Sequence, residues 1–393
     1  MNPSTSFVTS SRPSDHLGDF DLVVVGGGIL GLSHALHASD RGLRVAVVER
    51  DLYAVGASVR NFGHLCITAQ SGTARAYADV AREQWLRIGR QADINLRESG
   101  TVVVARTEHE TAVLEEFVQL HGPDEARFLT AAETADVLGV ESGEIQAGAH
   151  LPLDLRVNPL VAVGRLADLL RERGVAFFLG TNVGAVESGQ VLTSRGVLTA
   201  TNIVVAIGHD LDRLFPGLAD QYQVERCRLR MMEIKAPGGR VIGPAIFTGL
   251  SLLRYGAFAE LASTTAVRAD FMAHRPELLE HEINFMFTQR PDGALVVGDT
   301  HHRGRVEDPF ELERSDELLL EETKRLFGLD TVQVLRRWRG VYASSPMTDF
   351  LCETPLPGVR VTAVTTGIGM TCSLGFARDS LDSLLHSPAP TAA

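Results

Sequence analysis

The sequence predicts an α/β protein in which a β-α-β domain is interleaved with a mainly antiparallel β-sheet. First, residues 21–25 (DLVVV) and 44–50 (RVAVVER) are short apolar strands around a glycine-rich turn and a helical pattern, as in a pair of parallel strands. Second, residues 203–208 (IVVAIG) are apolar throughout, which is typical of a buried central strand. Third, residues 226–235 and 294–300 alternate between apolar and polar side chains, which favours half-buried antiparallel strands.

The order of these patterns indicates that the first domain is assembled from separate segments. Residues 159–174 form an amphipathic helical pattern, and residues 361–377 repeat the strand, glycine turn and helix of the N-terminal region. Helical patterns at residues 72–95 and 310–327 flank the alternating region. We therefore expect the first domain to comprise residues 20–75, 150–222 and 335–386, and the interleaved domain to comprise residues 76–149 and 223–334.

Composition excludes several classes of function. The chain has 393 residues and a net charge of −12, so a nucleic-acid partner is not expected. No apolar run reaches the roughly 18 residues of a membrane span. Residues 1–19 have no apolar core and are expected to be a floppy tail rather than a signal peptide. The four cysteines form no C-x-x-C pair, which argues against a metal site and favours free thiols in the cytoplasm.

A glycine motif after the first strand predicts dinucleotide binding in a Rossmann-like domain. Gly26, Gly28 and Gly31 form G-x-G-x-x-G, which permits a tight turn, close approach of the backbone to a pyrophosphate and close packing of helix on strand. The following helix directs free N–H groups and the positive end of its dipole at the phosphates. Glu49 ends the second strand, 23 residues after Gly26, where a carboxylate accepts hydrogen bonds from ribose hydroxyls.

A second glycine turn, 366-TGIGMT-371, favours a flavin over a nicotinamide cofactor. A helix that begins there directs its N-terminus at the pyrimidine edge of a flavin, where the reduced ring carries negative charge. An NAD-dependent dehydrogenase and a non-catalytic flavin-binding protein remain alternatives at this point.

The combination of motifs resembles the D-amino acid oxidase, glycine oxidase and sarcosine oxidase (DAO) family of FAD-dependent enzymes, over residues 20–385. The resemblance is carried by VVVGGGILG with Glu49, 56-GASVRNFGH-64, the strand at 204–208 and GIGMT. It implies non-covalent FAD, because no Cys occupies residues 336–346, although attachment through His64 stays open. Together with the glycine motif and Glu49, it implies FAD contacts at Ile29, Leu30, Arg50, Ser58, Asn61, Val183, Gly208, Gly367, Ile368, Gly369, Met370 and Thr371.

The family resemblance also implies a reaction. A C–H bond next to an amine gives hydride to flavin N5, the imine is hydrolysed, and oxygen or another acceptor reoxidises FAD. Such a reaction requires placement of the C–H bond more than a strong protein base. Segments including RNFGH, 249-GLSLLRY-255, 298-GDTHHRG-304 and RWRGVYASSP further resemble a subgroup often associated with phosphonate catabolism.

Several side chains are candidates for the substrate pocket. His64 is a candidate catalytic residue, with a structural loop histidine as the alternative. A third loop supplies Arg254 and Tyr255. His301 and Arg303 are candidates for contact with an anion or substrate, which is favoured over a metal site, and a solvated turn is the alternative.

The stretch 338-WRGVYASSP-346 is the most informative of these candidates. In amino acid oxidases of the family, a strand near this point carries an Arg that binds the substrate carboxylate, and alignment on Gly340 places Tyr342 there. A Tyr donates one hydrogen bond and cannot form the bidentate fork of an Arg. We therefore expect Tyr342, Ser344 and Arg339 to hold a head group with several oxygens, unless they only complete a buried strand.

The sequence thus predicts a flavoenzyme that oxidises the C–N bond of a small anionic amine. An aminophosphonate such as 2-aminoethylphosphonate, or its N-methyl derivative, is the favoured substrate, and Tyr342 joins His64 as a candidate catalytic residue. Oxidation of glycine, sarcosine or a D-amino acid is the alternative.

Overall fold

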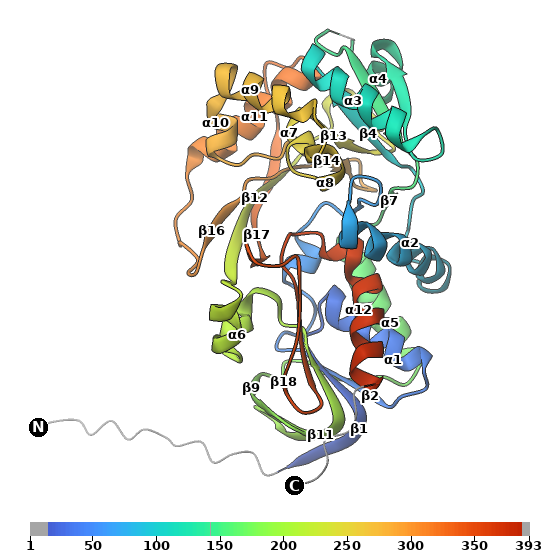
Figure 1. Ribbon diagram of the computed structural model, residues 1–393, viewed down its shortest axis with the longest axis vertical. Helices are drawn as coiled ribbons and strands as arrows, with labels where there is room; N and C mark the ends of the chain where they lie inside the picture. Colours follow the sequence, from blue (N-terminus) through green and yellow to red (C-terminus); the bar gives the residue numbers. More distant parts are fainter. Residues whose placement is uncertain (1–14, 142, 387–393) are drawn as a thin grey trace, which may run out of the picture.

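The computed structural model describes residues 15–141 and 143–386. The protein has two stacked parts, with one main β-sheet in each (Figure 1). Segments from the start, middle and end of the chain meet in the lower part, and the mixed α/β fold that the sequence predicts is confirmed.

The lower sheet is mainly parallel. β1 pairs in parallel with β2 and β11, so that Val24 lies between Val47 and Val204 in a fully apolar layer. Within the described residues its order is β18 (Phe350–Leu356), β19 (Val359–Val364), β11 (Gly196–Val205), β1 (His16–Val25), β2 (Val45–Val48) and β8 (Ala176–Phe178), extended by β10 (Gln190–Thr193) and β9 (Val183–Glu187).

Helices cover one face of this mainly parallel sheet. Apolar side chains of these helices and of β1 and β2 form one buried core, in which Trp85 is fully enclosed. The helices are α1 (Ile29–Asp40), α2 (Gly72–Ala92), α5 (Pro159–Glu172) and α12 (Gly369–His386). The opposite face packs against η2 (Gly208–Arg213) and α6 (Pro216–Gln221).

The upper sheet is mainly antiparallel. Its longest pair is β12 with β17, in which Cys227 lies opposite Tyr342. Its strands are β16 (His302–Gly304), β12 (Glu225–Ile234), β15 (Leu295–Gly298), β14 (Met286–Gln289), β13 (Ala245–Phe247), β4 (Thr101–Ala105), β6 (Ala147–Leu151), β5 (Arg127–Thr130) and β17 (Val334–Ser344). A separate short pair joins β3 (His64–Leu65) to β7 (Leu155–Arg156).

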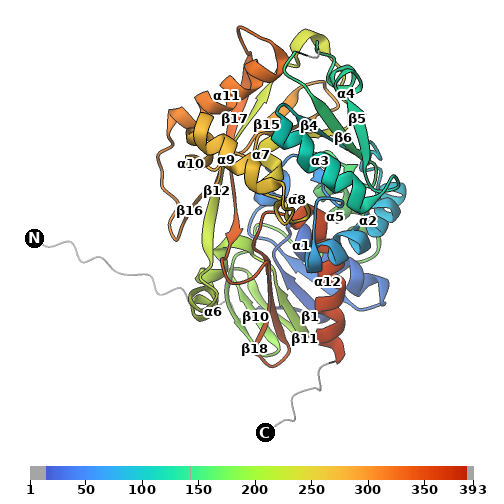
Figure 2. The same ribbon diagram turned by 45° about the horizontal axis from the view of Figure 1, so that its top comes forward.

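Helices pack over the upper sheet, as the turned view shows (Figure 2). They are α3 (Glu108–His121), α4 (Ala131–Leu138), α7 (Gly249–Leu252), α8 (Gly256–Ala259), α9 (Thr264–His274), α10 (Pro276–Glu280) and α11 (Glu313–Phe327). The short helical turns η1 (Ala57–Val59) and η3 (Pro237–Gly239) lie in loops. No helix in the described part of the chain is long and apolar enough to cross a bilayer.

The structure differs from the predicted segment boundaries in three places. The boundary at residue 75 falls inside α2, which packs with α12 on the lower sheet. The boundary after residue 149 cuts β6 of the upper sheet, and the boundary at residue 335 assigns β17 to the wrong sheet, because β17 pairs with β12. The N-terminal tail was predicted for residues 1–19. Residues 1–14 lie outside the described residues, and the prediction is wrong from residue 16 on, because β1 begins at His16.

The contact between α2 and α12 requires a residue without a side chain at position 375. A Cβ atom on Gly375 would lie 2.2 Å from the backbone oxygen of Tyr77, and backbone cannot move aside as a flexible side chain can. We predict that Gly375→Ala lowers the free energy of unfolding by at least about 2 kcal/mol, as overpacking does. Denaturant unfolding curves measure it.

Gly164→Ala is the matched control. Gly164 is an exposed residue of α5, and nothing lies within 4 Å of the position that a Cβ atom would take there. Alanine at this position should leave stability unchanged or raise it by up to about 1 kcal/mol, because it favours the helix. Equal stabilities for the two variants would contradict this account of the α2–α12 contact.

Candidate functional site

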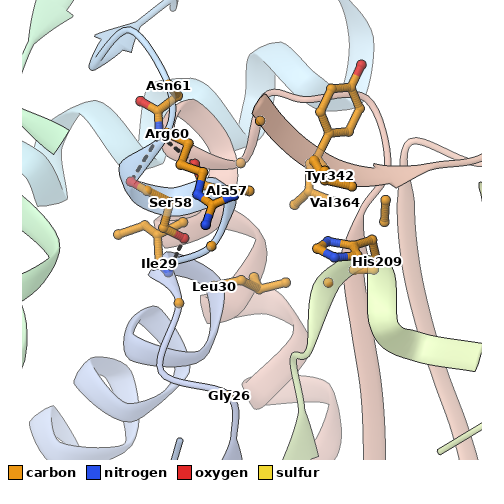
Figure 3. Close-up of a pocket in the computed structure, with 18 of the residues that line it drawn as sticks. Gly26, Ile29, Leu30, Ala57, Ser58, Arg60, Asn61, His209, Tyr342 and Val364 are labelled. Carbon is orange, nitrogen blue, oxygen red and sulfur yellow. Dashed lines mark hydrogen bonds between the residues drawn. The ribbon is translucent and has the colours of Figure 1, made fainter. Parts of the chain in front are cut away.

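A cavity of about 580 Å³ lies where the carboxyl ends of β1 and β2 face the upper sheet. In open α/β sheets ligands bind outside the carboxyl ends of the strands. Figure 3 shows residues of the lower part, such as Gly26 and Ile29, at one end of the cavity and Tyr342 of β17 at the other. The cavity therefore joins the two parts of the molecule.

The turn from β1 to α1 needs glycine at two positions. Gly26 has a φ of +107°, and a Cβ on it would lie 2.4 Å from the oxygen of Ala206. A Cβ on Gly31 would lie 1.9 Å from the oxygen of Gly26. Both distances are shorter than any real contact of a Cβ atom, so only glycine allows the backbone to pack this closely. The first turn of α1 is thereby held at the cavity.

Polar side chains from neighbouring loops hold this turn. The carboxylate of Glu49 accepts hydrogen bonds from the N–H of Gly27 at 2.7 Å and the N–H of Asp51 at 3.0 Å. The hydroxyl of Ser58 accepts from the N–H of Ile29 at 2.9 Å. Because each carboxylate oxygen has two lone pairs, Glu49 retains acceptor capacity on the cavity side.

The loop that carries Ser58 is closed by Asn61. Its amide donates to the backbone oxygens of Ala57 and Ser58, both at 2.9 Å (Figure 3). Its oxygen accepts from the N–H of Gly63 at 2.8 Å. Asn61 thereby fixes the chain that leads to His64 in β3.

The N-terminal end of α12 forms the wall between the two ends of the cavity. Gly367 precedes it with a φ of +78°, a conformation that side chains disfavour. The oxygen of Met370 accepts from the indole N–H of Trp85 at 3.0 Å, and the hydroxyl of Thr371 accepts from the N–H of Cys66 at 3.1 Å. These bonds tie the helix end to α2 and to the segment after β3.

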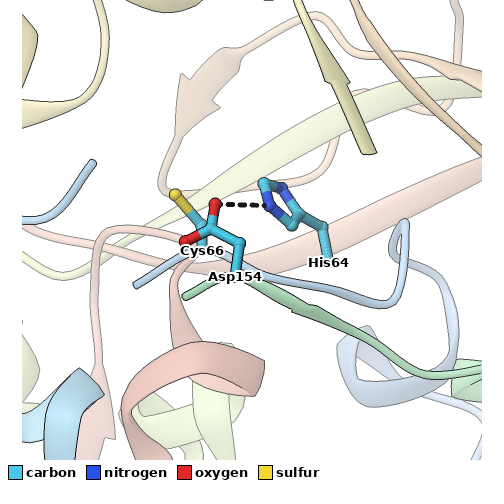
Figure 4. Close-up of side chains that lie close together, drawn as sticks. All are labelled: His64, Cys66 and Asp154. Carbon is cyan, nitrogen blue, oxygen red and sulfur yellow. Dashed lines mark hydrogen bonds and ion pairs between the residues drawn. The ribbon is translucent and has the colours of Figure 1, made fainter. Parts of the chain in front are cut away.

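His64 is held by a buried carboxylate (Figure 4). Its Nε2 lies 3.2 Å from Oδ2 of Asp154 and 2.7 Å from Oγ1 of Thr101, and its ring packs edge-on against Phe247. Burial alone would raise the pKa of Asp154, but hydrogen bonds from His64 and Thr101 hold that pKa below its ordinary value. The histidine is therefore fixed in orientation at the cavity wall.

Cys66 completes a group of three side chains whose ligand atoms lie within 4.8 Å of one another. Asp154 also accepts hydrogen bonds from the N–H groups of Ile67 and Thr68 and from the hydroxyl of Thr101. Burial raises the pKa of the Cys66 thiol well above its ordinary value, so the thiol stays protonated. This chemistry fits a hydrogen-bonded framework better than a metal centre.

A guanidinium group enters the other end of the cavity. Nη2 of Arg254 lies 3.4 Å from the hydroxyl of Tyr342 and 3.2 Å from the backbone oxygen of Thr366. Among the described residues no carboxylate forms an ion pair with Arg254. Tyr255 lies next to it in the cavity wall and stacks on Phe247.

A carboxylate lines the same end. Asp299 follows β15 and is 6% exposed, and its Oδ1 accepts a hydrogen bond from the amide of Asn284 at 3.2 Å. The amide oxygen of Asn284 accepts in turn from the hydroxyl of Ser251 at 2.8 Å, so the amide orientation is fixed.

Most residues of the predicted FAD contacts line this cavity. Gly31 does not, because it packs α1 against the sheet. The lining members are Gly26, Gly28, Ile29, Leu30, Glu49, Arg50, Ser58, Asn61, Val183, Gly208, Gly367, Ile368, Gly369, Met370 and Thr371.

The predicted substrate and catalytic residues divide into two groups. His64, Tyr255 and Tyr342 line the cavity. Arg303 instead pairs with Glu282, and the Arg339 guanidinium pairs with glutamates of the loop after β16. Ser344 ends β17 beside Thr366, outside the lining, and His301 lies behind Asp299.

Sequence reasoning missed Asp299 and Asn284. Asp299 stands inside the stretch GDTHHRG, where the paired histidines are the more conspicuous feature. A carboxylate directly after a buried apolar strand was the available signal, since such a position is seldom charged without a partner. Asn284 carries no comparable signal.

Comparison with known proteins identifies related chains. A family model described as "FAD dependent oxidoreductase" (DAO) matches residues 21–381. Glycine oxidase of Bacillus licheniformis is 24% identical over 336 residues, which cover 82% of this chain and 80% of that protein. Glycine oxidase of Geobacillus kaustophilus is 26% identical over 234 residues, which cover 56% of this chain and only 62% of that protein.

Solved structures show the same fold. Glycine oxidase from Geobacillus kaustophilus superposes with a TM-score of 0.74 at 18% identity, covering 95% of this chain and 96% of that one. L-proline dehydrogenase from P. horikoshii gives a TM-score of 0.76 at 16% identity with the same coverage. The family model removes the NAD-dependent alternative, because the family uses FAD.

The cavity residues fit FAD. Gly28 leaves the first turn of α1 open to the cavity, and a Cβ there would lie 3.1 Å from the hydroxyl of Ser58. The helix N-terminus suits the diphosphate, and Glu49 suits a ribose. The end of α12, with Gly367 and Gly369, would face the flavin.

We predict that Gly28→Val abolishes FAD binding, because a branched side chain would occupy the approach to the diphosphate. The ratio of flavin to protein after purification measures the effect. Gly217→Val is the control, since Gly217 is exposed on α6 with open space at its Cβ position, and it should retain FAD. Normal FAD content in Gly28→Val would refute the placement of the diphosphate.

Proposed function

Because the chain belongs to the DAO family of FAD dependent oxidoreductases, we propose that it oxidises the C–N bond of a small amine that carries an anionic group. One observation carries the proposal: the cavity contains the guanidinium of Arg254, hydrogen-bonded to Tyr342 and without an ion-pair partner among the described residues. A half-buried cation without an ion-pair partner is stabilised by an anionic ligand.

The chain's own residues bind and orient the substrate in this reaction. Bound FAD supplies the hydride acceptor. Arg254 and Tyr342 would hold the anionic end, while apolar side chains such as Met231 and Met286 keep water from the reacting carbon. The resulting imine is hydrolysed to a carbonyl product and ammonia or an amine.

Two head groups are candidates for the anionic end. The relatives named glycine oxidase favour a carboxylate, as in glycine, sarcosine or a D-amino acid. The sequence argued against a carboxylate because Tyr342 takes the place of a carboxylate-binding Arg. Arg254 weakens that argument, because it brings a guanidinium group next to Tyr342. An aminophosphonate is the second candidate, because Arg254, Tyr342 and Tyr255 together offer more donors than a carboxylate needs.

The proposed substrate contacts are therefore Arg254, Tyr255 and Tyr342. We leave out Arg303, Arg339 and Ser344, because they do not line the cavity. For His64 we propose a positioning role rather than a catalytic one, because Asp154 and Thr101 fix the orientation of its ring. Non-covalent FAD and a cytoplasmic location stay predictions.

Anaerobic reduction of the bound flavin tests the function. Glycine, sarcosine, D-alanine, 2-aminoethylphosphonate and its N-methyl derivative are mixed in turn with the holoenzyme, and loss of visible flavin absorbance is followed. Reduction by at least one amine is expected, and the fastest one identifies the head group. A flavin that none of them reduces would contradict the proposal and favour a non-catalytic flavoprotein.

We predict that Arg254→Gln lowers kcat/KM for the best substrate by roughly 10- to 150-fold, because a hydrogen bond to a charged group contributes about 1.5–3 kcal/mol. Steady-state kinetics measure the change. Arg314→Gln, which removes an exposed guanidinium on α11, should leave kcat/KM unaltered. Equal kinetics for the two variants would remove Arg254 from the site.

We predict a smaller effect for Tyr342→Phe. The variant retains the ring but loses the hydroxyl beside Arg254, so KM should rise by about 5- to 10-fold, in line with a neutral hydrogen bond of about 1 kcal/mol. The same kinetic assay applies. Unchanged KM and kcat would mean that the hydroxyl contacts only Arg254.

A further inference from the structure

Asp299 presents an unused carboxylate oxygen to the cavity. Oδ1 accepts a hydrogen bond from Asn284, whereas Oδ2 has no hydrogen bond from any described residue. The backbone of Asp299 exchanges hydrogen bonds with that of Asn284 at 2.8 and 2.9 Å, which fixes its position at the end of β15. A buried carboxylate with a free oxygen is costly unless a ligand satisfies it.

Asp299 and Arg254 act on each other without direct contact. Both line the cavity and each favours the charged form of the other, yet no ion pair joins them within the described residues. Some other buried charges of the upper part form direct ion pairs, as Arg106 does with Glu322 at 2.7 Å. One cavity thus holds a cation and an anion at separate positions, which matches a substrate with an anionic end and an ammonium end.

The surroundings of Asp299 disfavour its ionised form. Burial raises its pKa to about 6, although Arg254 and the amide of Asn284 act in the opposite direction. The other titratable groups that face it are Tyr255, Cys227 and Tyr342, whose pKa values burial raises, so they are uncharged at neutral pH.

His301 offers a partner for the protonated form of Asp299. Nδ1 of His301 lies 3.0 Å from the oxygen of Glu282 and must carry the proton to bond to it, so Nε2 is an acceptor. Nε2 is fully enclosed, has no hydrogen-bond partner and lies 3.8 Å from Oδ2 of Asp299. Burial lowers the pKa of His301 well below its ordinary value, so the ring stays neutral.

On the basis of the proposed amine oxidation, we propose that Asp299 binds the substrate ammonium group and accepts its proton. One N–H bond of the ammonium breaks and one O–H bond forms at Oδ2, so the nitrogen regains its lone pair and the carboxylate becomes a neutral acid. Nε2 of His301 is 3.8 Å from Oδ2, so the new O–H donates to it once the two side chains move closer by several tenths of an ångström. No other reactant is needed.

The proton transfer has a physical reason. Hydride leaves the carbon readily only when the neighbouring nitrogen has a free lone pair, and simple amines are protonated at neutral pH. An amine is a stronger base than a carboxylate in water. A cavity that excludes water reduces this difference, because it disfavours an ion pair relative to two neutral groups.

The pH dependence of Asp299→Asn tests the proposal in the holoenzyme. In the wild type, kcat/KM should fall only below a pH of about 6, where Asp299 becomes protonated. The asparagine variant must take the rare neutral amine from solution. Its kcat/KM should be on the order of 10²- to 10³-fold lower at neutral pH, rise about tenfold per pH unit, and approach the wild-type value near the pKa of the substrate ammonium.

Binding of simple anions provides a readout without turnover. Acetate carries a carboxylate but no amine, and methylphosphonate is its counterpart for the second head group. Asp299→Asn should bind the matching anion at least as tightly as the wild type, judged by perturbation of the flavin spectrum, because it removes a negative charge from the cavity. This result would also show that the variant folds.

Glu282→Gln is the charge control. Glu282 is exposed, pairs with Arg303 and does not line the cavity, so its pH profile should match that of the wild type. A deficit of Asp299→Asn that is independent of pH, or a wild-type profile in that variant, would overturn the role of Asp299. A wild-type flavin that no amine reduces would instead contradict the proposed function.

His301→Leu is a second variant, useful if Asp299→Asn fails to fold. It removes the acceptor for the protonated form of Asp299, so the acid limb of kcat/KM should move to lower pH. If kcat/KM of this variant fell at the same pH as that of the wild type, the role assigned to His301 and proton acceptance at Oδ2 would both be overturned.

Discussion

The cavity depends on a turn without side chains between β1 and α1. The N–H of Gly26 donates to the oxygen of Val48, and the N–H of Ala206 donates to the oxygen of Val25, both at 2.8 Å. The turn is thereby held between β2 and β11, with the position of a Gly26 Cβ only 2.4 Å from the Ala206 oxygen. A side chain there would push α1 away from the sheet, and the first turn of the helix would no longer reach the cavity.

Some charged side chains in the upper part of the molecule form direct ion pairs, and others line the cavity without one. Arg290 and Glu233 pair at 3.1 Å, and Arg106 pairs with Glu322, so each buried charge is compensated by the protein. Arg254 and Asp299 form no direct ion pair with each other among the described residues, although each favours the charged form of the other. A ligand with complementary charges gives a reason for their separation.

The local patterns in the sequence were sufficient to predict the mixed α/β fold and most of the residues that line the end of the cavity near β1 and α1. Those residues lie close together in sequence, and the glycine spacing reports a backbone geometry directly. The other end is built from several segments that are distant in sequence, and its contacts depend on strand pairing that a single sequence does not reveal. Tyr342 is opposite Cys227 only because β17 pairs with β12 in one particular register.

The alternation of side chains along β17 explains why Tyr342 lines the cavity and Arg339 does not. Side chains separated by an odd number of residues point to opposite faces of a strand, so Arg339 and Tyr342 cannot line the same wall. Arg339 accordingly meets Glu307 and Glu311 on the outer face of β17. The same alternation applied to the sequence would have removed Arg339 in advance, whereas the position of Asp299 in the cavity required the tertiary structure.

The two ends of the cavity are coupled at Gly367. A Cβ on this residue would lie 3.0 Å from Cζ of Tyr342 and 3.3 Å from Nη2 of Arg254. Glycine is therefore needed for two reasons, because the turn into α12 requires a positive φ and because Tyr342 and Arg254 pack directly over it. Any side chain at this position would displace Tyr342 and Arg254 as well as the helix end. The wall that would face the flavin thus also sets the position of the two side chains that we propose to bind the substrate's anionic group.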